Sequence, residues 1–136
     1  MQKQIIEEGT EVLSESTSSY IFYIEKKRSN HNMSIKELCD KAGIAEQTYY
    51  RYKRLDVQVN EEAAIRFAIA MDMDLNDALS FLKHGDILLD PHNKTERLLM
   101  RAIEHHEKNF DSINEQLEKY SCKPFFKPKR DMFSDY

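Results

Sequence analysis

Hydrophobic side chains recur along the chain at intervals of three and four residues, the spacing of one face of an α-helix. The stretch from Ser34 to Arg54 shows this pattern twice, interrupted at Gly43. Its apolar positions are Ile35, Leu38, Cys39 and Ala42 before the interruption and Ile44, Tyr49 and Tyr52 after it. Ser34 followed by Glu37 is the signature of a capping box, and glycine suits the left-handed residue that ends a helix. The stretch therefore predicts two short helices joined by a tight turn, a helix-turn-helix.

Further helical patterns precede and follow this motif. The predicted helices cover residues 20–28, 61–71, 75–83 and 94–109, and a last helix starts after Asp111 and contains Ile113, Leu117 and Tyr120. Asn60, Asp74 and Asp111 are expected to cap three of these helices, and Asp72 is expected to end one in a left-handed conformation. Strand alternation and internal repeats are absent from the sequence. The prediction is an all-α fold of about seven helices.

The 75–83 helix is expected to turn three side chains toward the interior. These are Ala78, Leu79 and Leu82.

Composition divides the chain into four parts. Residues 1–19 are a polar segment in which Ile5, Ile6, Val12 and Leu13 either form a short helix that docks on the body or belong to a frayed terminus. Residues 20–83 form the helix-turn-helix domain and residues 84–120 form a C-terminal helical extension. Residues 121–136 contain two prolines, three phenylalanines and four basic residues, which predicts a flexible basic and aromatic tail. That tail is interpreted as a basic arm, a docking peptide or a disordered end.

The chain of 136 residues has a net charge of −4, but its charge is unevenly distributed. Residues 20–54 carry eight basic and four acidic side chains, a balance of +4, whereas residues 1–19 have a balance of −3. The positive segment coincides with the helix-turn-helix, which favours a basic face. Apolar runs long enough to span a membrane and a signal-peptide pattern are both absent from the sequence, so we expect a cytoplasmic protein without membrane contact. Cys39 and Cys122 are expected to be free thiols, a disulfide between them being the less favoured alternative.

The helix-turn-helix and its flanking helices resemble the phage-repressor-like family of the Cro/cI or Xre type. The resemblance covers about residues 20–82 and includes the run IRFAIAMDMDLNDAL. It implies a lambda-repressor-like five-helix DNA-binding domain. The stretch after residue 75 also resembles the two-helix C-terminal extension found in a group of uncharacterised bacterial helix-turn-helix proteins.

Three positions depart from the pattern of that family. Ala45 stands where the family usually has Ser or Thr as the cap of the recognition helix, and Asp72 replaces a usual glycine. Lys53 stands where the family usually has a glutamate that pairs with the arginine at Arg28. The resemblance therefore implies that this pair is missing.

The outer face of the second helix is suited to reading base edges. Glutamine bonds adenine through two hydrogen bonds, and arginine does the same with guanine or holds phosphate. Backbone N–H groups and a lysine at the start of the first helix suit a phosphate backbone. The candidate DNA-binding residues are Ser34, Lys36, Glu46, Gln47, Tyr50, Arg51, Lys53 and Arg54. The alternative is that this face is merely solvated, which Glu46 favours because a carboxylate repels phosphate. Tyr49 and Tyr52 are interpreted as packing residues and not as stacking platforms for bases.

Catalytic, metal-binding and cofactor-binding patterns are not found in the sequence. The five histidines have no chelating spacing, and His105 and His106 point in different directions on a helix. Glycine-rich phosphate loops and arrangements of a nucleophile with a base are also missing. We therefore expect no enzymatic activity, metal or cofactor.

Two functions remain open. The first is a sequence-specific DNA-binding transcriptional regulator that reads the major groove of double-stranded DNA with the helix over residues 45–54, as a homodimer. The alternative is a protein–protein interaction module, such as an antitoxin, an adaptor or a phage modulator, which uses its C-terminal helices or its tail to bind a partner.

Overall fold

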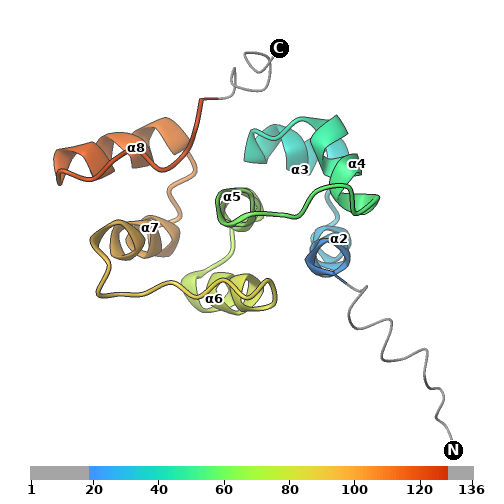
Figure 1. Ribbon diagram of the computed structural model, residues 1–136, viewed down its shortest axis with the longest axis horizontal. Helices are drawn as coiled ribbons and strands as arrows, with labels where there is room; N and C mark the ends of the chain where they lie inside the picture. The colour runs from blue at the N-terminus through green and yellow to red at the C-terminus, as the bar shows by residue number, and fades with distance from the viewer. Residues whose placement is uncertain (1–18, 129–136) are drawn as a thin grey trace, which may run out of the picture.

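The computed structural model describes residues 19–128, which form seven α-helices and no β-strand (Figure 1). The helices are α2 (Tyr20–Asn30), α3 (Ile35–Ala42), α4 (Glu46–Lys53), α5 (Glu61–Ala70), α6 (Leu75–Lys83), α7 (Lys94–Glu104) and α8 (Phe110–Lys119). The predicted all-α class is thus confirmed for this part of the chain. The interpretations of residues 1–18 and 129–136 lie outside the described residues.

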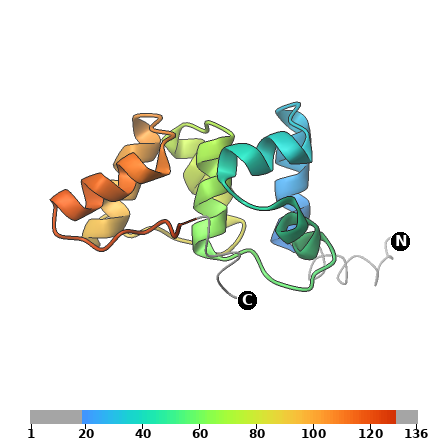
Figure 2. The same ribbon diagram turned by 90° about the horizontal axis from the view of Figure 1, so that it is seen from above.

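Helix α5 lies at the centre of the molecule, between α2, α3 and α4 on one side and α7 and α8 on the other (Figures 1 and 2). All eight residues from Ala63 to Ala70 are buried. Four of these residues are alanines, which let neighbouring helices approach closely. Phe67 meets the rings of Tyr49 and Tyr52 edge-on, with centroid separations of 5.8 and 6.4 Å. Helix α4 is therefore packed directly on the central helix.

Side-chain caps determine where most of these helices begin. As predicted, the side chains of Ser34, Asn60 and Asp74 each accept a hydrogen bond from the backbone N–H three residues on, at 2.9–3.0 Å. The prediction that Asp111 caps the last helix is wrong. Asn109 caps it, because its Oδ1 accepts from the N–H of Ser112 at 3.0 Å. The helix therefore starts at Phe110.

The predicted helix over residues 94–109 ends early, at Glu104. His106 has a left-handed φ of 55°, and its Nδ1 lies 2.9 Å from Oδ1 of Asp72. The other carboxylate oxygen of Asp72 lies 3.3 Å from Nζ of Lys108. Asp72 itself has φ 54°, as predicted for the end of α5. One carboxylate thus binds the α7–α8 connection to the α5–α6 turn, a contact that interrupts the helix.

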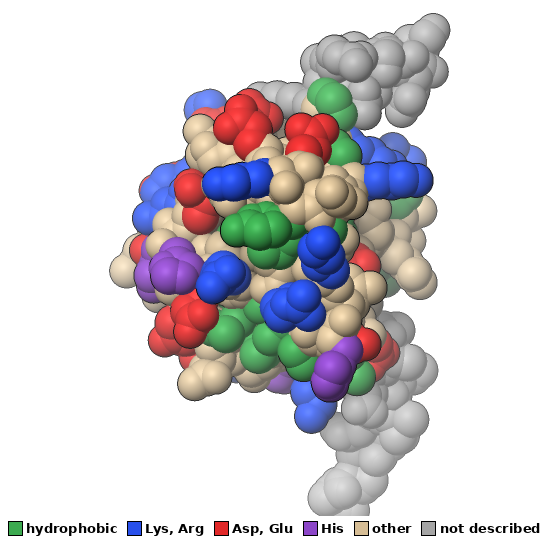
Figure 3. Space-filling model, turned by 90° about the vertical axis from the view of Figure 1, so that its left-hand side faces the viewer, with side chains coloured by type: hydrophobic (Ala, Val, Ile, Leu, Met, Phe, Trp, Pro, Cys, Tyr) green, Lys and Arg blue, Asp and Glu red, His purple; other side chains and the backbone are tan. Residues whose placement is uncertain are grey.

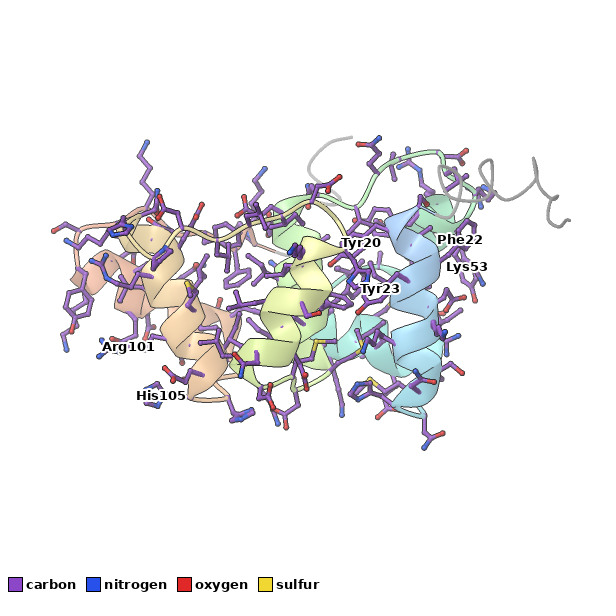
Figure 4. All side chains as sticks on the ribbon, turned by 90° about the horizontal axis from the view of Figure 1, so that it is seen from below. Tyr20, Phe22, Tyr23, Lys53, Arg101 and His105 are labelled. Carbon is purple, nitrogen blue, oxygen red and sulfur yellow. The ribbon has the colours of Figure 1, made fainter. Side chains whose placement is uncertain are left out.

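The inward face of α6 is formed by Ala78, Phe81 and Leu82, whereas Leu79 is only half-buried. Phe81 is fully buried and packs against Tyr20 and Tyr23, at centroid separations of 5.5 and 5.8 Å. Figure 4 shows these two tyrosines on the side of α2 that faces α6. Inclusion of Leu79 among the inward residues was wrong because Phe81, one turn after Ala78, occupies that face.

The first residues of the predicted flexible tail are packed on the body. Phe126 is 3% exposed and packs against Phe110 with tilted rings, at 4.8 Å between ring centroids. The Oδ1 of Asn114 accepts from the N–H groups of Phe125 and Phe126 at 2.9 and 3.0 Å, and its Nδ2 donates to the carbonyl of Phe126 at 2.8 Å. The side-chain amide of Asn114 thus supplies hydrogen-bond partners for the backbone of a segment that has no helical or strand pattern in its sequence. This corrects the predicted flexibility for residues 121–128.

Both cysteines are free thiols. Cys39 is buried in the core, as predicted, and burial raises the pKa of its thiol to about 12. Among the helices of residues 19–128, none has the length and apolar character required to cross a membrane.

Candidate nucleic-acid interface

Helices α3 and α4 are joined by Gly43, Ile44 and Ala45. Gly43 has φ 70° and ψ 34°, the left-handed conformation that costs other residues free energy. A Cβ at this position would lie 2.8 Å from Nη1 of Arg66, which donates to the carbonyl of Ala42 at 3.0 Å. Glycine is therefore favoured here by the left-handed backbone, and a Cβ would in addition displace the end of the Arg66 side chain.

Helix α4 begins without a side-chain cap, as the alanine at position 45 implies. The backbone carbonyl of Ala45 accepts from the N–H groups of Thr48 and Tyr49 at 3.0 and 3.2 Å. Glu46 in the first turn interacts favourably with the positive end of the helix dipole. The position of α4 consequently depends on contacts along its inner face.

The inner face of α4 is bound to α2 through Glu25. One oxygen of this carboxylate accepts from Nε of Arg28 at 2.7 Å and from the hydroxyl of Tyr49 at 3.0 Å. The other oxygen lies 2.6 Å from Nζ of Lys53. Arg28 also donates to the carbonyl of Met33 at 2.6 Å, which ties the end of the α2–α3 connection to the same network. A carboxylate on α2 thus holds two residues of α4.

The network changes the protonation behaviour of Glu25. Burial by itself raises the pKa of this carboxyl, but hydrogen bonds from Lys53, Arg28 and Tyr49 outweigh burial and leave the pKa below its usual value. Tyr49 shows the opposite direction, since burial and the neighbouring Glu25 carboxylate raise its pKa. Glu25 is therefore ionised and Tyr49 neutral around neutral pH, which is the state in which the hydroxyl donates.

Lys53 belongs to this network and not to the outer face of α4. Its side chain is 35% exposed, and it lies on the same side of α2 as Phe22 (Figure 4). Its Nζ also approaches the ring of Tyr50, at 5.9 Å from the centroid. The resemblance implied that Arg28 would lack its carboxylate partner because of Lys53, whereas the structure supplies that carboxylate from Glu25.

The outward side of α4 carries the other predicted residues of the second helix. Glu46, Gln47, Tyr50, Arg51 and Arg54 are exposed. Tyr49 and Tyr52 are 0% and 7% exposed, which confirms that they pack and do not present their rings to solvent. The structure thus separates the aromatic residues of α4 into a packed pair and a single exposed ring, Tyr50, which is 42% exposed.

Most cations around this face have carboxylate partners. Nζ of Lys36 lies 3.2 Å from Asp40, and Nε of Arg54 lies 3.0 Å from Asp56. Arg51 makes no ion pair within residues 19–128. Because exposed pairs contribute only about 0–1 kcal/mol, a phosphate group can displace their carboxylates at little cost.

The start of α3 lies beside these residues in sequence and carries two predicted site residues. The side chain of Ser34 is used as the helix cap, so it is not a free donor toward a ligand. The backbone N–H groups of Ile35 and Lys36, in the first turn, have no acceptor within the helix. Contact of Lys36 and these amides with a phosphate backbone stays a prediction.

Basic side chains also occur at the opposite end of the molecule. Figure 3 shows Lys and Arg side chains around apolar surface there. Arg101 of α7 is exposed and makes no ion pair within residues 19–128, and it borders a groove with Leu98 and Tyr120. Positive charge alone therefore does not distinguish α4 as the candidate nucleic-acid interface.

Two residues that organise the interface were not found from the sequence. Glu25 lies three residues before Arg28, a spacing that indicates a pair on one helix but does not reveal the bond to α4. Arg66 is the one charged residue in the buried run from Ala63 to Ala70, and it is 8% exposed. An isolated charge within an apolar helix was the available signal for Arg66.

Within the described part of the chain, no group of three or more His, Cys, Asp or Glu side chains could hold a metal ion. The chain matches no protein-family model, no curated protein and no solved structure.

Proposed function

We propose that this chain is a sequence-specific DNA-binding transcriptional regulator in which α4 enters the major groove. The observation that carries the proposal is the division of α4 into two faces. Tyr49, Tyr52 and Lys53 hold one face against the body, while Gln47, Tyr50 and Arg51 are exposed on the other. A rigid helix with an exposed Gln and Arg has the donors that recognise adenine and guanine edges.

The neighbouring elements support this role. The left-handed Gly43 and the short connection between α3 and α4 fit a helix-turn-helix, and the order of helices over residues 20–83 fits the proposed relation to phage-repressor-like proteins. Lys36 and the first turn of α3 would contact the phosphate backbone and fix the register. As a cytoplasmic homodimer the protein would read two half-sites about one helical turn, roughly 34–36 Å, apart.

An electrophoretic shift with a library of random-sequence DNA duplexes at low salt tests the proposal. The full-length chain is expected to shift DNA and to enrich one sequence motif. Arg51→Ala is expected to abolish the enrichment, whereas Arg101→Ala, which removes an exposed arginine from α7, leaves it intact. Lack of any shift, or equal effects of the two substitutions, would contradict the proposal. Sedimentation equilibrium measures the dimer independently of DNA.

A second candidate function is a protein–protein interaction module. It is favoured by Glu46, which is exposed in the first turn of α4, and by the carboxylate partners of Lys36 and Arg54. The net charge of −4 also favours it. In that case the chain would form a complex of fixed stoichiometry with a partner protein and would give no shift in the same DNA assay.

A further inference from the structure

The solvent side of α7 has two hollows that share a border. Leu98 and Arg101 lie between a hollow of about 240 Å³ toward α8 and another of about 350 Å³ toward the α6–α7 connection. The hollow toward α8 contains Ile113, which is buried, and Tyr120, which is 43% exposed. Pockets for small molecules have volumes of about 300–1,000 Å³, so these hollows suit the side chains of a protein partner better. We call the two hollows, with Arg97 at the edge of the second, the α7 face.

The exposed residues of α7 are mostly basic. Lys94, Arg97 and Arg101 are exposed, and Glu104 is the one exposed acidic residue of this helix, although the chain has a net charge of −4. None of the three cations makes an ion pair within residues 19–128. Arg97 donates to the carbonyl of Pro91 at 2.9 Å. Figure 3 shows Lys and Arg side chains around apolar surface on this side of the molecule. A basic surface of this kind on an acidic protein favours a negatively charged partner.

Three carboxylates lie near the α7 face. Glu107 lines the hollow toward α8, and its Oε1 accepts from the N–H of Asn109 at 3.1 Å. Glu96 is half-buried, and its Oε1 accepts from the N–H of Asp90 at 2.7 Å. Glu104 lines the other hollow and is the last residue of α7. Two of the three carboxylates are thus bonded to backbone N–H groups, and the cations of α7 keep their charge available for a partner.

We propose that the α7 face binds an acidic peptide segment of a partner protein. Apolar side chains of the segment enter the two hollows, and its carboxylates lie against Arg97 and Arg101. Arginine and tyrosine are enriched among the residues that dominate binding energy at protein interfaces, and Arg101 and Tyr120 supply both here. Duplex DNA fits this face less well, because apolar hollows between the cations offer no donors to a phosphate backbone.

The α7 face lies across α5 from α4, as Figures 1 and 2 show, so the two surfaces are separate. The inference deepens the second candidate function, on which the biological role of the peptide rests. Binding of the peptide itself does not depend on binding of DNA by α4.

Selection from a displayed library of random peptides on the full-length chain tests the proposal. Peptides of about 16 residues are long enough for about four helical turns. We expect the enriched peptides to combine Asp or Glu with Leu, Phe or Trp. Fluorescence anisotropy of the most enriched peptide, labelled with fluorescein, then measures its Kd. Arg101→Glu should weaken this Kd about tenfold or more, because it reverses the charge between the hollows, and Tyr120→Ala should weaken it about threefold to tenfold.

The matched control is Arg51→Glu. It makes the same charge reversal at an exposed arginine of α4 that also has no ion pair within residues 19–128. This variant should leave the Kd of the peptide unchanged. Because Arg101 is exposed, Arg101→Glu should keep the urea midpoint of the wild type, which separates lost binding from lost folding.

Four results would overturn the proposal. They are no enrichment of any peptide, enrichment of basic peptides, a Kd that Arg101→Glu leaves unchanged, and an equal loss with Arg51→Glu. A fall in the molar mass of the chain in sedimentation equilibrium on Arg101→Glu would assign the face to a second copy, and loss of the DNA shift on Arg101→Ala would assign it to phosphate. Either result also overturns the acidic peptide.

The two proposals fail in different ways. If the chain shifts no DNA while an acidic peptide binds in a way that depends on Arg101, the proposed DNA binding fails and the α7 face stands. If DNA is shifted in a way that depends on Arg51 while no acidic peptide is enriched, the α7 face fails and the DNA binding stands.

Discussion

Replacing Arg66 by methionine removes a guanidinium that joins three parts of the fold. Its Nη1 donates to the carbonyl of Ala42 at the end of α3, and its Nη2 donates to the carbonyl of Lys127 at 2.8 Å. Its Nε bonds Glu62 at 3.1 Å, and the same Glu62 oxygen accepts from the N–H of Lys127. Methionine keeps the apolar stem but cannot donate to any of these acceptors.

The magnitude follows from the groups left behind. A buried acceptor that loses its donor costs about 1–3 kcal/mol, and breaking a buried ion pair costs about 3–5 kcal/mol. The two carbonyls and the carboxylate are not all fully buried, and Glu62 still accepts the hydrogen bond from the N–H of Lys127. The cost therefore lies at the lower end of the range for a broken ion pair. The guanidinium also lies over Phe110 and Phe126 at 4.7 and 5.2 Å, contacts that the methionine sulfur partly replaces. We expect a loss of about 3 kcal/mol.

Urea unfolding monitored by circular dichroism measures this change. A loss of about 3 kcal/mol is a large share of the stability of a single domain, which is about 5–15 kcal/mol. Arg66→Lys should fall between the wild type and Arg66→Met, because one amine can reach only part of the acceptors. Limited chymotrypsin digestion supplies a second readout, since release of residues 123–128 from the body should expose the buried Phe126 to cleavage.

The matched control is Arg101→Met, which makes the same chemical change at an exposed position of α7 and should alter stability by no more than about 0.5 kcal/mol. If Arg66→Met costs less than about 1 kcal/mol and leaves the chymotrypsin cleavage rate unchanged, the inferred role of Arg66 is wrong.

Three more predictions concern the α3–α4 region and use the same unfolding assay. Glu25→Gln should cost about 1–2 kcal/mol at pH 7, since it weakens the charge-assisted bonds to Lys53 and Arg28. Folding lowers the pKa of Glu25, so its contribution to stability is complete above the unfolded pKa of about 4.3 and is lost as the pH falls through the folded pKa. A difference in unfolding free energy between wild type and Glu25→Gln that persists undiminished at pH 2 would contradict this. Ala45→Ser should stabilise the protein by about 1 kcal/mol by capping α4, and an unchanged urea midpoint would show that the cap is not formed. Gly43→Ala should cost about 2 kcal/mol, from the positive φ and the displacement of Arg66, and a neutral effect would contradict the close approach of that side chain.

The helix-turn-helix boundaries could be read from the sequence because their signals are local. Ser34 and Gly43 lie within one helical turn of the positions whose conformation they determine. The packed and exposed sides of α4 also follow from the periodicity of its apolar residues, which is why Tyr49 and Tyr50 could be assigned to opposite faces. These are the features of the candidate site that the sequence pattern predicted correctly.

The errors occurred where two segments distant in sequence meet. The sequence pattern did not reveal that Lys53 pairs with Glu25, which approaches it from another helix. The tail was predicted to be flexible because its partners lie far from it in sequence. Asn114 lies 12 residues before Phe126, and Arg66 lies 61 residues before Lys127. A pattern of neighbouring residues contains no information about such contacts.

The sequence by itself determined the all-α class, the helix caps at Ser34, Asn60 and Asp74, and the turn at Gly43, because short-range hydrogen bonds and periodic burial decide these features. Only the tertiary structure decided which charged groups are available at the surface. Arg51 is left without an ion pair within residues 19–128, and Lys53 is not, because the position of α2 places Glu25 against one side of α4. The free energy of an ion pair depends on distance and burial, and both are set by the packing of whole helices.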